Sequence, residues 1–284
     1  MKYIWLLSVL LLISLETQCQ QERTLFQFST PLHLSLKDTS KHIKVMQLAR
    51  KGNFGVGTFP RIGDELIALN GEYYLSKANG RVYPATPAMK APFAVVGNFK
   101  PEKTLAVTED LDLPALKRFL DQSIDNKNHV QAIHIEGTFR SISLRSLPDQ
   151  VPAIRLEDEK RVDKQALDLR LQQGSLVGFR YPEHMSRFNT PGYHFHFIDS
   201  SRKVGGYVIA LQTGISRVEI DNLEAIKIKC TPSSSILKAD AFSITILTFP
   251  MITTDHIRRI DPLLMFRTMA DNLPQKLAIA HGLY

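Results

Sequence analysis

The segment 188–211, FNTPGYHFHFIDSSRKVGGYVIAL, constrains the fold of this chain more than any other stretch. An alternating, aromatic run over 193–198 is followed by polar residues at 199–203, then by two glycines and a second apolar run. This order of residue types is typical of a β-hairpin. The sequence therefore predicts two neighbouring strands here, joined by a polar turn.

Two histidines lie in the first strand of this predicted hairpin. Because side chains alternate along a strand, His194 and His196 share one face, and the aromatic residues at 193, 195 and 197 share the other. A strand rise of about 3.3 Å per residue separates the two imidazoles by about 7 Å at Cα, so both can reach one cation. Two half-exposed histidines on a sheet face are the alternative.

Composition and charge describe an ordinary globular protein. The chain has 284 residues, of which 44% are hydrophobic and 22% charged, so general disorder is excluded. The net charge is +7, but the basic residues are scattered and no nucleic-acid-binding motif accompanies them. We expect no nucleic-acid partner, and a basic surface that can gather anionic substrates.

The first residues have the organisation of an export signal. Residues 1–20 contain one lysine, an apolar run over 3–15 and a polar end, which predicts a secretory signal peptide. The apolar run is too short for a stable transmembrane helix. We expect a periplasmic or extracellular protein with no stable membrane span after signal removal. Cys19 permits a lipid anchor, although residues 16–18 lack the small side chains expected before a lipidated cysteine.

Most of the remaining patterns are strand-like. Residues 24–30 alternate as a strand, and residues 52–85 contain short β-rich runs separated by Gly-Asp and Asn-Gly pairs, which predicts an antiparallel meander. Residues 129–148 predict a strand, a glycine turn and a second strand with a bulge near 140–141.

Two segments have helical patterns. Residues 40–50 predict a helix or a pair of turns, with Thr39 or Ser40 as the N-cap. Residues 111–126 place four aliphatic side chains on one face, behind a proline near the start. Strand-rich segments with two intervening helices predict an α+β fold with mixed or antiparallel sheets and flanking helices.

Glu65 is a candidate for a perturbed carboxylate. It shares a strand face with Ile67 and Leu69, and an apolar setting disfavours the charged form of a carboxyl group. The alternative is a rim residue with its carboxylate in water.

Three separated blocks of this sequence resemble the α-acetolactate decarboxylase family. They are GTF with DEL at 57–66, EGTF with LR at 136–145, and PGYHFHF with DSSRKVGGYV at 191–208. The resemblance implies decarboxylation of 2-acetolactate, a 2-hydroxy-3-oxo acid, to acetoin. It also implies two similar strand-rich halves, a metal site in the second half, and a homodimer.

The resemblance implies a role for each matching residue. His194 and His196 would bind Zn²⁺, which stabilises charge as a Lewis acid while carbon dioxide leaves. Arg145 would fix the substrate carboxylate or an oxyanion, and Glu65 would manage the proton delivered to the enediolate carbon. Thr58 would donate a hydrogen bond.

The chain departs from the family pattern at two places. Tyr207 stands where the family has its third zinc-binding histidine, and phenol, with a pKa near 10, is a poor zinc ligand at neutral pH. A carboxylate, a water, His134 or His184 could complete the set instead. The family also takes an active-site glutamate from its C-terminal segment, and no glutamate follows Glu224 here.

These departures leave three functional hypotheses open. The protein is an active enzyme with altered metal ligation, a weak or inactive relative, or an exported module that binds a small anion or a partner. We expect subdomains at 21–128 and 129–242, the second carrying the metal hairpin. The tail at 243–284 has no correspondence in the family.

Overall fold

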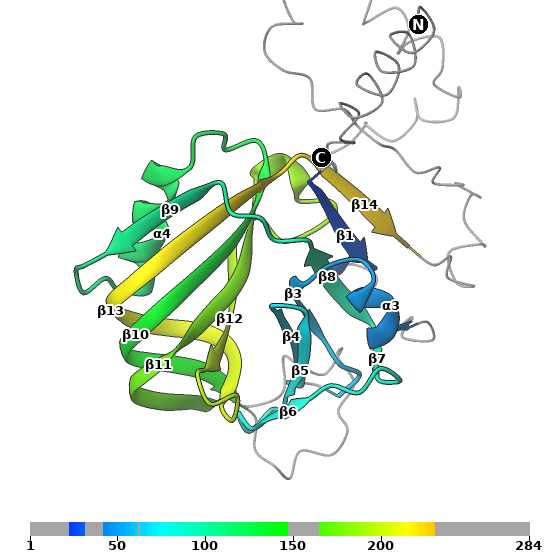
Figure 1. The fold of residues 1–284 in the computed structure, drawn as a ribbon, viewed down its shortest axis with the longest axis horizontal. Helices are drawn as coiled ribbons and strands as arrows, with labels where there is room; N and C mark the ends of the chain where they lie inside the picture. Colours follow the sequence, from blue (N-terminus) through cyan, green and yellow to red (C-terminus); the bar gives the residue numbers. More distant parts are fainter. Residues whose placement is uncertain (1–22, 32–41, 62, 147–164, 231–284) are drawn as a thin grey trace, which may run out of the picture. The chain divides into compact units, whose positions relative to one another are not determined.

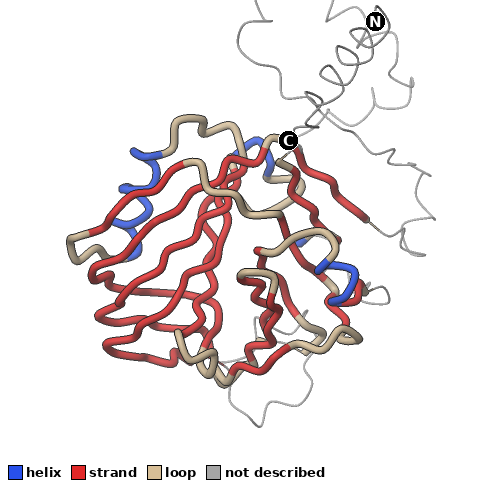
Figure 2. Tube along the Cα trace, in the orientation of Figure 1, coloured by secondary structure: helices blue, strands red, loops and turns tan. Residues whose placement is uncertain are grey.

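The computed structural model describes residues 23–31, 42–61, 63–146 and 165–230 (Figure 1). The predicted signal peptide, Cys19 and the tail at 243–284 lie outside these residues. Strands make up most of the described chain, as Figure 2 shows, which confirms the strand-rich α+β prediction. No helix within the described ranges is both long and apolar enough to cross a bilayer.

The first sheet has seven strands in the order β14-β1-β8-β3-β4-β5-β6. Its strands are β1 (Thr24–Phe28), β3 (Phe54–Thr58), β4 (Glu65–Leu69), β5 (Glu72–Ser76), β6 (Val82–Pro84), β8 (Phe93–Gly97) and β14 (Ala225–Lys229). Only β1 and β14 pair in parallel. The predicted first strand and meander are confirmed. Asn70 and Gly71 both have positive φ, as a tight hairpin turn requires.

The second sheet has five strands, and four of them pair in a closed ring. They are β10 (Val130–Ser146), β11 (Gln165–Tyr181), β12 (Gly192–Asp199), β13 (Gly205–Leu223) and β9 (Lys103–Val107), in the order β10-β11-β12-β13-β9 with a further pairing of β10 with β13. β2 (Ile43–Lys44) and β7 (Lys90–Ala91) form a small third sheet.

Sheet membership does not follow chain order. β9 precedes the predicted boundary at residue 128 yet lies in the second sheet, and β14 comes from the later part of the chain yet lies in the first sheet. Each sheet therefore depends on a strand from the other part of the chain. The proposed division into 21–128 and 129–242 stays a prediction.

The predicted amphipathic helix is confirmed as α4 (Leu113–Ser123). The carboxylate of Asp112 accepts a hydrogen bond from the Ala115 N–H and caps the helix. Leu116 and Leu120 are buried in a core shared with the second sheet.

The helix predicted over 40–50 is shorter than expected. α3 (Val45–Ala49) begins after Lys44, because residues 43 and 44 pair with β7 as a strand. Thr39 and Ser40 lie outside the described residues. The last helical element that the structure describes is the 3₁₀ turn η2 (Glu183–Met185).

The predicted glycine turn in residues 129–148 is wrong. β10 runs unbroken through Gly137, which faces the backbone of β13: a Cβ at this position would lie 2.4 Å from the Ile215 carbonyl oxygen. The glycine therefore permits close approach of two strands and makes no turn. The predicted bulge near 140–141 is confirmed by a register shift between Phe139 and Ser141.

Gly137→Ala is expected to lower the free energy of unfolding by about 1–3 kcal/mol, because the added methyl group would force two paired backbones apart. Gly97→Ala is the matched control, since the nearest atom to a Cβ there is 3.7 Å away. Urea unfolding of both variants measures the difference. Equal midpoints for the two variants would contradict close packing at Gly137.

Candidate active site

The predicted hairpin is confirmed as β12 and β13, and Asp199 organises its turn. The carboxylate oxygen Oδ1 of Asp199 accepts hydrogen bonds from the backbone N–H groups of Lys203 and Val204, each at 2.7 Å. Aspartate commonly accepts hydrogen bonds from the backbone N–H groups of the turn in which it lies. The two strands that this turn joins place His196 directly opposite Tyr207.

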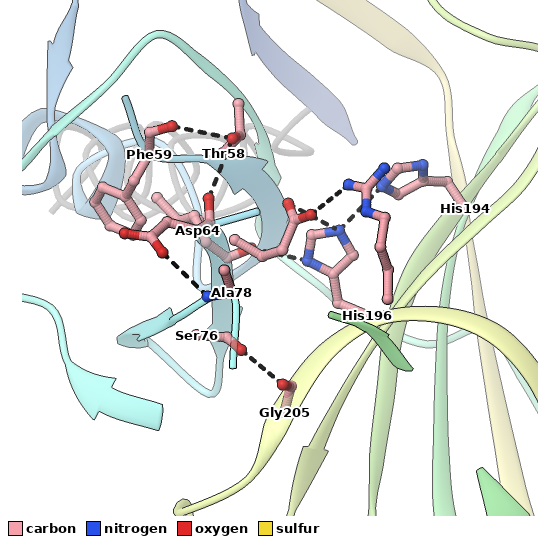
Figure 3. Close-up of polar contacts among 11 residues, drawn as sticks. Thr58, Phe59, Asp64, Ser76, Ala78, His194, His196 and Gly205 are labelled. Carbon is pink, nitrogen blue, oxygen red and sulfur yellow. Dashed lines mark hydrogen bonds and ion pairs between the residues drawn. The ribbon is translucent and has the colours of Figure 1, made fainter. Parts of the chain in front are cut away.

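The hairpin turn is fastened to the first sheet by three hydrogen bonds. The Val82 N–H donates to the Lys203 carbonyl at 2.9 Å, and the Gly205 N–H donates to the Gly80 carbonyl at 2.9 Å. The fully buried Ser76 hydroxyl donates to the Gly205 carbonyl at 2.7 Å (Figure 3). Because Ser76 pairs with Glu65 across β4 and β5, these bonds bring the Glu65 strand to the hairpin.

The two hairpin histidines face each other in the site. Their Nε2 atoms are 3.0 Å apart, and the Nδ1 of His196 lies 3.2 Å from the Leu66 carbonyl oxygen. A carbonyl only accepts, so this Nδ1 carries the hydrogen and the His196 Nε2 keeps its lone pair. Burial, together with the nearby charge of Arg145 and, for His194, the neighbouring His196, lowers the pKa of each imidazole to about 3. Both rings are therefore neutral near pH 7.

Glu65 and Arg145 join the histidines from two other strands. Glu65 is 6% exposed, and its Oε1 accepts a hydrogen bond from the Arg145 Nη2 at 2.5 Å. Its Oε2 lies 3.8 Å from the His196 Nε2. The structure thus gathers four of the predicted site residues, from β4, β10 and β12, around one position.

The other two predicted residues take different places. Tyr207 lies within the cluster. The centroid of its ring is 4.9 Å from the centroid of the His194 ring and 4.5 Å from the guanidinium carbon of Arg145. Thr58 pairs with Glu65 across β3 and β4, but its hydroxyl is 3.1 Å from the carbonyl oxygens of both Phe59 and Asp64 (Figure 3). That hydroxyl therefore supports the turn before β4, and its part in chemistry stays a prediction.

The histidine pair fits two positions of a zinc site. Zinc–nitrogen bonds of 2.0–2.1 Å in a tetrahedral site place two nitrogens about 3.3 Å apart, close to the 3.0 Å observed. The His196 Nδ1–H also donates to the Leu66 carbonyl, which is the outer hydrogen bond that usually orients a metal-binding imidazole. Among the described residues, however, no group of three His, Cys, Asp or Glu side chains has an arrangement suited to a metal ion.

Neither alternative histidine completes the set. The Nδ1 of His134 lies 2.9 Å from Glu219 Oε2 and its Nε2 lies 3.2 Å from Ser175 Oγ, so both ring nitrogens are engaged. His184 lies exposed on η2.

Sequence reasoning missed the hydrogen-bonded order Ser175–His134–Glu219. It has the acid–imidazole–hydroxyl order of a hydrolase triad. Yet Ser175 is 3% exposed and its strand is paired on both sides, so a substrate carbonyl cannot reach the hydroxyl. This cluster satisfies buried polar groups between strands. Sequence reasoning also missed Ser76 and Asp199; the turn position of Asp199 was the available signal.

Comparison with known proteins places relatives along most of this chain. The family model for alpha-acetolactate decarboxylase matches residues 25–242. An alpha-acetolactate decarboxylase from Methanosarcina mazei is 36% identical over 190 residues, covering 66% of this chain and 65% of that protein. This chain therefore spans slightly less than two thirds of that relative's length.

Two solved structures share the fold. A Staphylococcus aureus protein, described as of unknown function and similar to alpha-acetolactate decarboxylase, superposes with a TM-score of 0.67 and 27% identity, over 77% of this chain and 94% of that one. The alpha-acetolactate decarboxylase of Bacillus subtilis strain 168 gives a TM-score of 0.69 at 23% identity, over 76% and 93%. Because the family model matches most of this chain, the chain belongs to the alpha-acetolactate decarboxylase family.

Proposed function

We propose that this protein decarboxylates 2-acetolactate to acetoin at the cluster of Glu65, Arg145, His194 and His196. One observation carries the proposal: residues from three separated sequence blocks meet at hydrogen-bonding or near-contact distances in one site. Membership of the family and its relatives' names support the same reaction.

The reaction requires stabilisation of charge on the substrate. The bond between the carboxylate carbon and the neighbouring carbon breaks, carbon dioxide leaves, and the electron pair moves onto the adjacent ketone to give an enediolate. A proton delivered to carbon then yields acetoin. Fixed positive groups near the developing oxyanion lower this barrier most effectively in a site that excludes water.

His194 and His196 would hold a divalent ion. We assign it as Zn²⁺, because imidazole nitrogens are common zinc ligands. When bound, this ion supplies Lewis-acid stabilisation of the substrate oxygens. The chain contributes two neutral imidazoles, so neither ring has to lose the extra proton of an imidazolium before it binds the ion at neutral pH.

Arg145 and Glu65 would act directly on the substrate. A guanidinium presents five N–H donors in a planar fork, so Arg145 can hold Glu65 and a substrate carboxylate together. Glu65 would carry the proton to the enediolate carbon, and its bond to Arg145 fixes the face from which that proton arrives.

A binding role without turnover is the second candidate, because Tyr207 stands at the third ligand position suggested by the family pattern. In that case the exported protein would bind a small anion or a partner. A ligand-dependent rise in melting temperature without acetoin release would favour it. A homodimer stays a prediction.

Zinc content tests the metal proposal. Purified protein is expected to contain stoichiometric zinc, and His196→Ala to lose it, because one of two imidazole ligands is removed. Chelation should abolish acetoin release and added zinc should restore it, whereas Tyr207→His should raise zinc affinity. The exposed His184→Ala is the control. Equal metal content in His196→Ala and His184→Ala would contradict the assignment.

Glu65→Gln is expected to slow acetoin formation by about 10²–10⁴-fold, since general acid–base groups contribute that range. The optical purity of the remaining acetoin should also fall, because proton delivery loses its fixed face. Glu136→Gln is the control: it breaks an exposed ion pair with Arg217. Chiral gas chromatography measures both quantities, and unchanged rate and optical purity in Glu65→Gln would exclude the proton role.

We also propose export of the mature protein after removal of residues 1–20. Mass spectrometry of the protein isolated from its cell envelope or medium is expected to show a new N-terminus near Cys19. A diacylglyceryl mass on Cys19 would add a lipid anchor, an unmodified start after Cys19 would remove it, and an intact Met1 would contradict export.

A further inference from the structure

Tyr207 lies where three strands of the second sheet bring charged and aromatic groups together. It is the partner of His196 in the β12–β13 pair, and its ring packs edge-on against both imidazoles, with centroid distances of 4.9 Å to His194 and 5.9 Å to His196. Its neighbour Val208 pairs with Leu144, which places Tyr207 beside the end of β10. Arg145 is the next residue along that strand.

The guanidinium group of Arg145 covers one face of the Tyr207 ring. The guanidinium carbon of Arg145 lies 4.5 Å from the ring centroid, within the range of a cation–π contact. The same guanidinium donates to Glu65 at 2.5 Å. Arg145 is therefore held between a carboxylate of the first sheet and an aromatic face of the second.

We propose that Tyr207 is a positioning residue for Arg145 and acts through its ring, not through its hydroxyl as a zinc ligand. A guanidinium stacks well on an aromatic face, whereas a phenol must lose a proton with a pKa near 10 to become a good ligand. The kinetic consequence of this inference rests on the proposed function. The contact itself does not.

Contact with the Tyr207 ring restricts the conformations of the Arg145 side chain before the substrate carboxylate binds to it. Arg145 has a long side chain whose rotamer freedom would otherwise have to be lost on substrate binding. Stacking on Tyr207 removes much of that freedom beforehand, and preorganisation of this kind favours binding. Loss of the ring should therefore raise KM more than it lowers kcat.

Two substitutions separate the ring from the hydroxyl. Tyr207→Leu removes both and is expected to lower kcat/KM by roughly two- to thirtyfold, mostly through KM, as the range of cation–π energies implies. Tyr207→Phe keeps the ring and should recover most of this loss while retaining the zinc content of the parent protein. Tyr83→Leu is the matched control, since it removes a tyrosine ring under Lys77, at 5.0 Å, outside the site.

A double-mutant cycle tests the contact without any assay of turnover. Tyr207→Leu should shift the urea midpoint less in an Arg145→Met background than in the parent, because the cation is already absent. Tyr207→Phe should show little coupling to position 145. If the parent releases no acetoin, the proposed function fails, and this cycle still decides the role of the ring.

Two results would overturn the inference. The first is a Tyr207→Phe variant that loses zinc and as much kcat/KM as Tyr207→Leu, which would assign the hydroxyl as a ligand. The second is strict additivity of Tyr207→Leu and Arg145→Met in unfolding. The Phe variant also keeps the question answerable if Tyr207→Leu does not fold.

Discussion

The site depends on the hydrogen-bonded junction between the turn of the β12–β13 hairpin and the β5–β6 region. Ser76 is fully buried, and its bond to the Gly205 carbonyl links the strand paired with β4 to the strand that carries Tyr207. A buried hydroxyl that has lost its water must keep such a partner, so the junction is costly to open. It fixes the separation between the Glu65 carboxylate and the hairpin.

Burial of the two hairpin histidines determines the charge state of the site. The imidazoles are neutral because water is largely excluded and Arg145 is near, which lowers the pKa of both His194 and His196. The ion pair between Arg145 and Glu65 joins the two sheets at the same place. The arrangement brings two neutral imidazoles and a fixed guanidinium together, and these are the groups on which the proposed decarboxylation depends.

Local patterns predicted the elements well where one physical cause dominates. Alternation predicted the hairpin, Asn70-Gly71 predicted a turn, and the apolar face with Pro114 near its start predicted α4. Patterns failed where a residue serves a distant contact. Gly137 is a residue type typical of turns, but in this fold it allows β10 to lie close to β13. The residues next to Gly137 in the sequence give no indication of that contact.

The sequence by itself determined which chemical groups the chain carries and which face of each strand they share, because strand periodicity is local. Periodicity thus made His194, His196 and Glu65 candidates, and the resemblance to the family added Arg145. Only the tertiary structure decided that Glu65 bonds Arg145, that His134 is engaged by Glu219 and Ser175, and that Tyr207 stacks on Arg145. These contacts join residues far apart in the chain, and their geometry is set by sheet pairing that sequence periodicity does not specify.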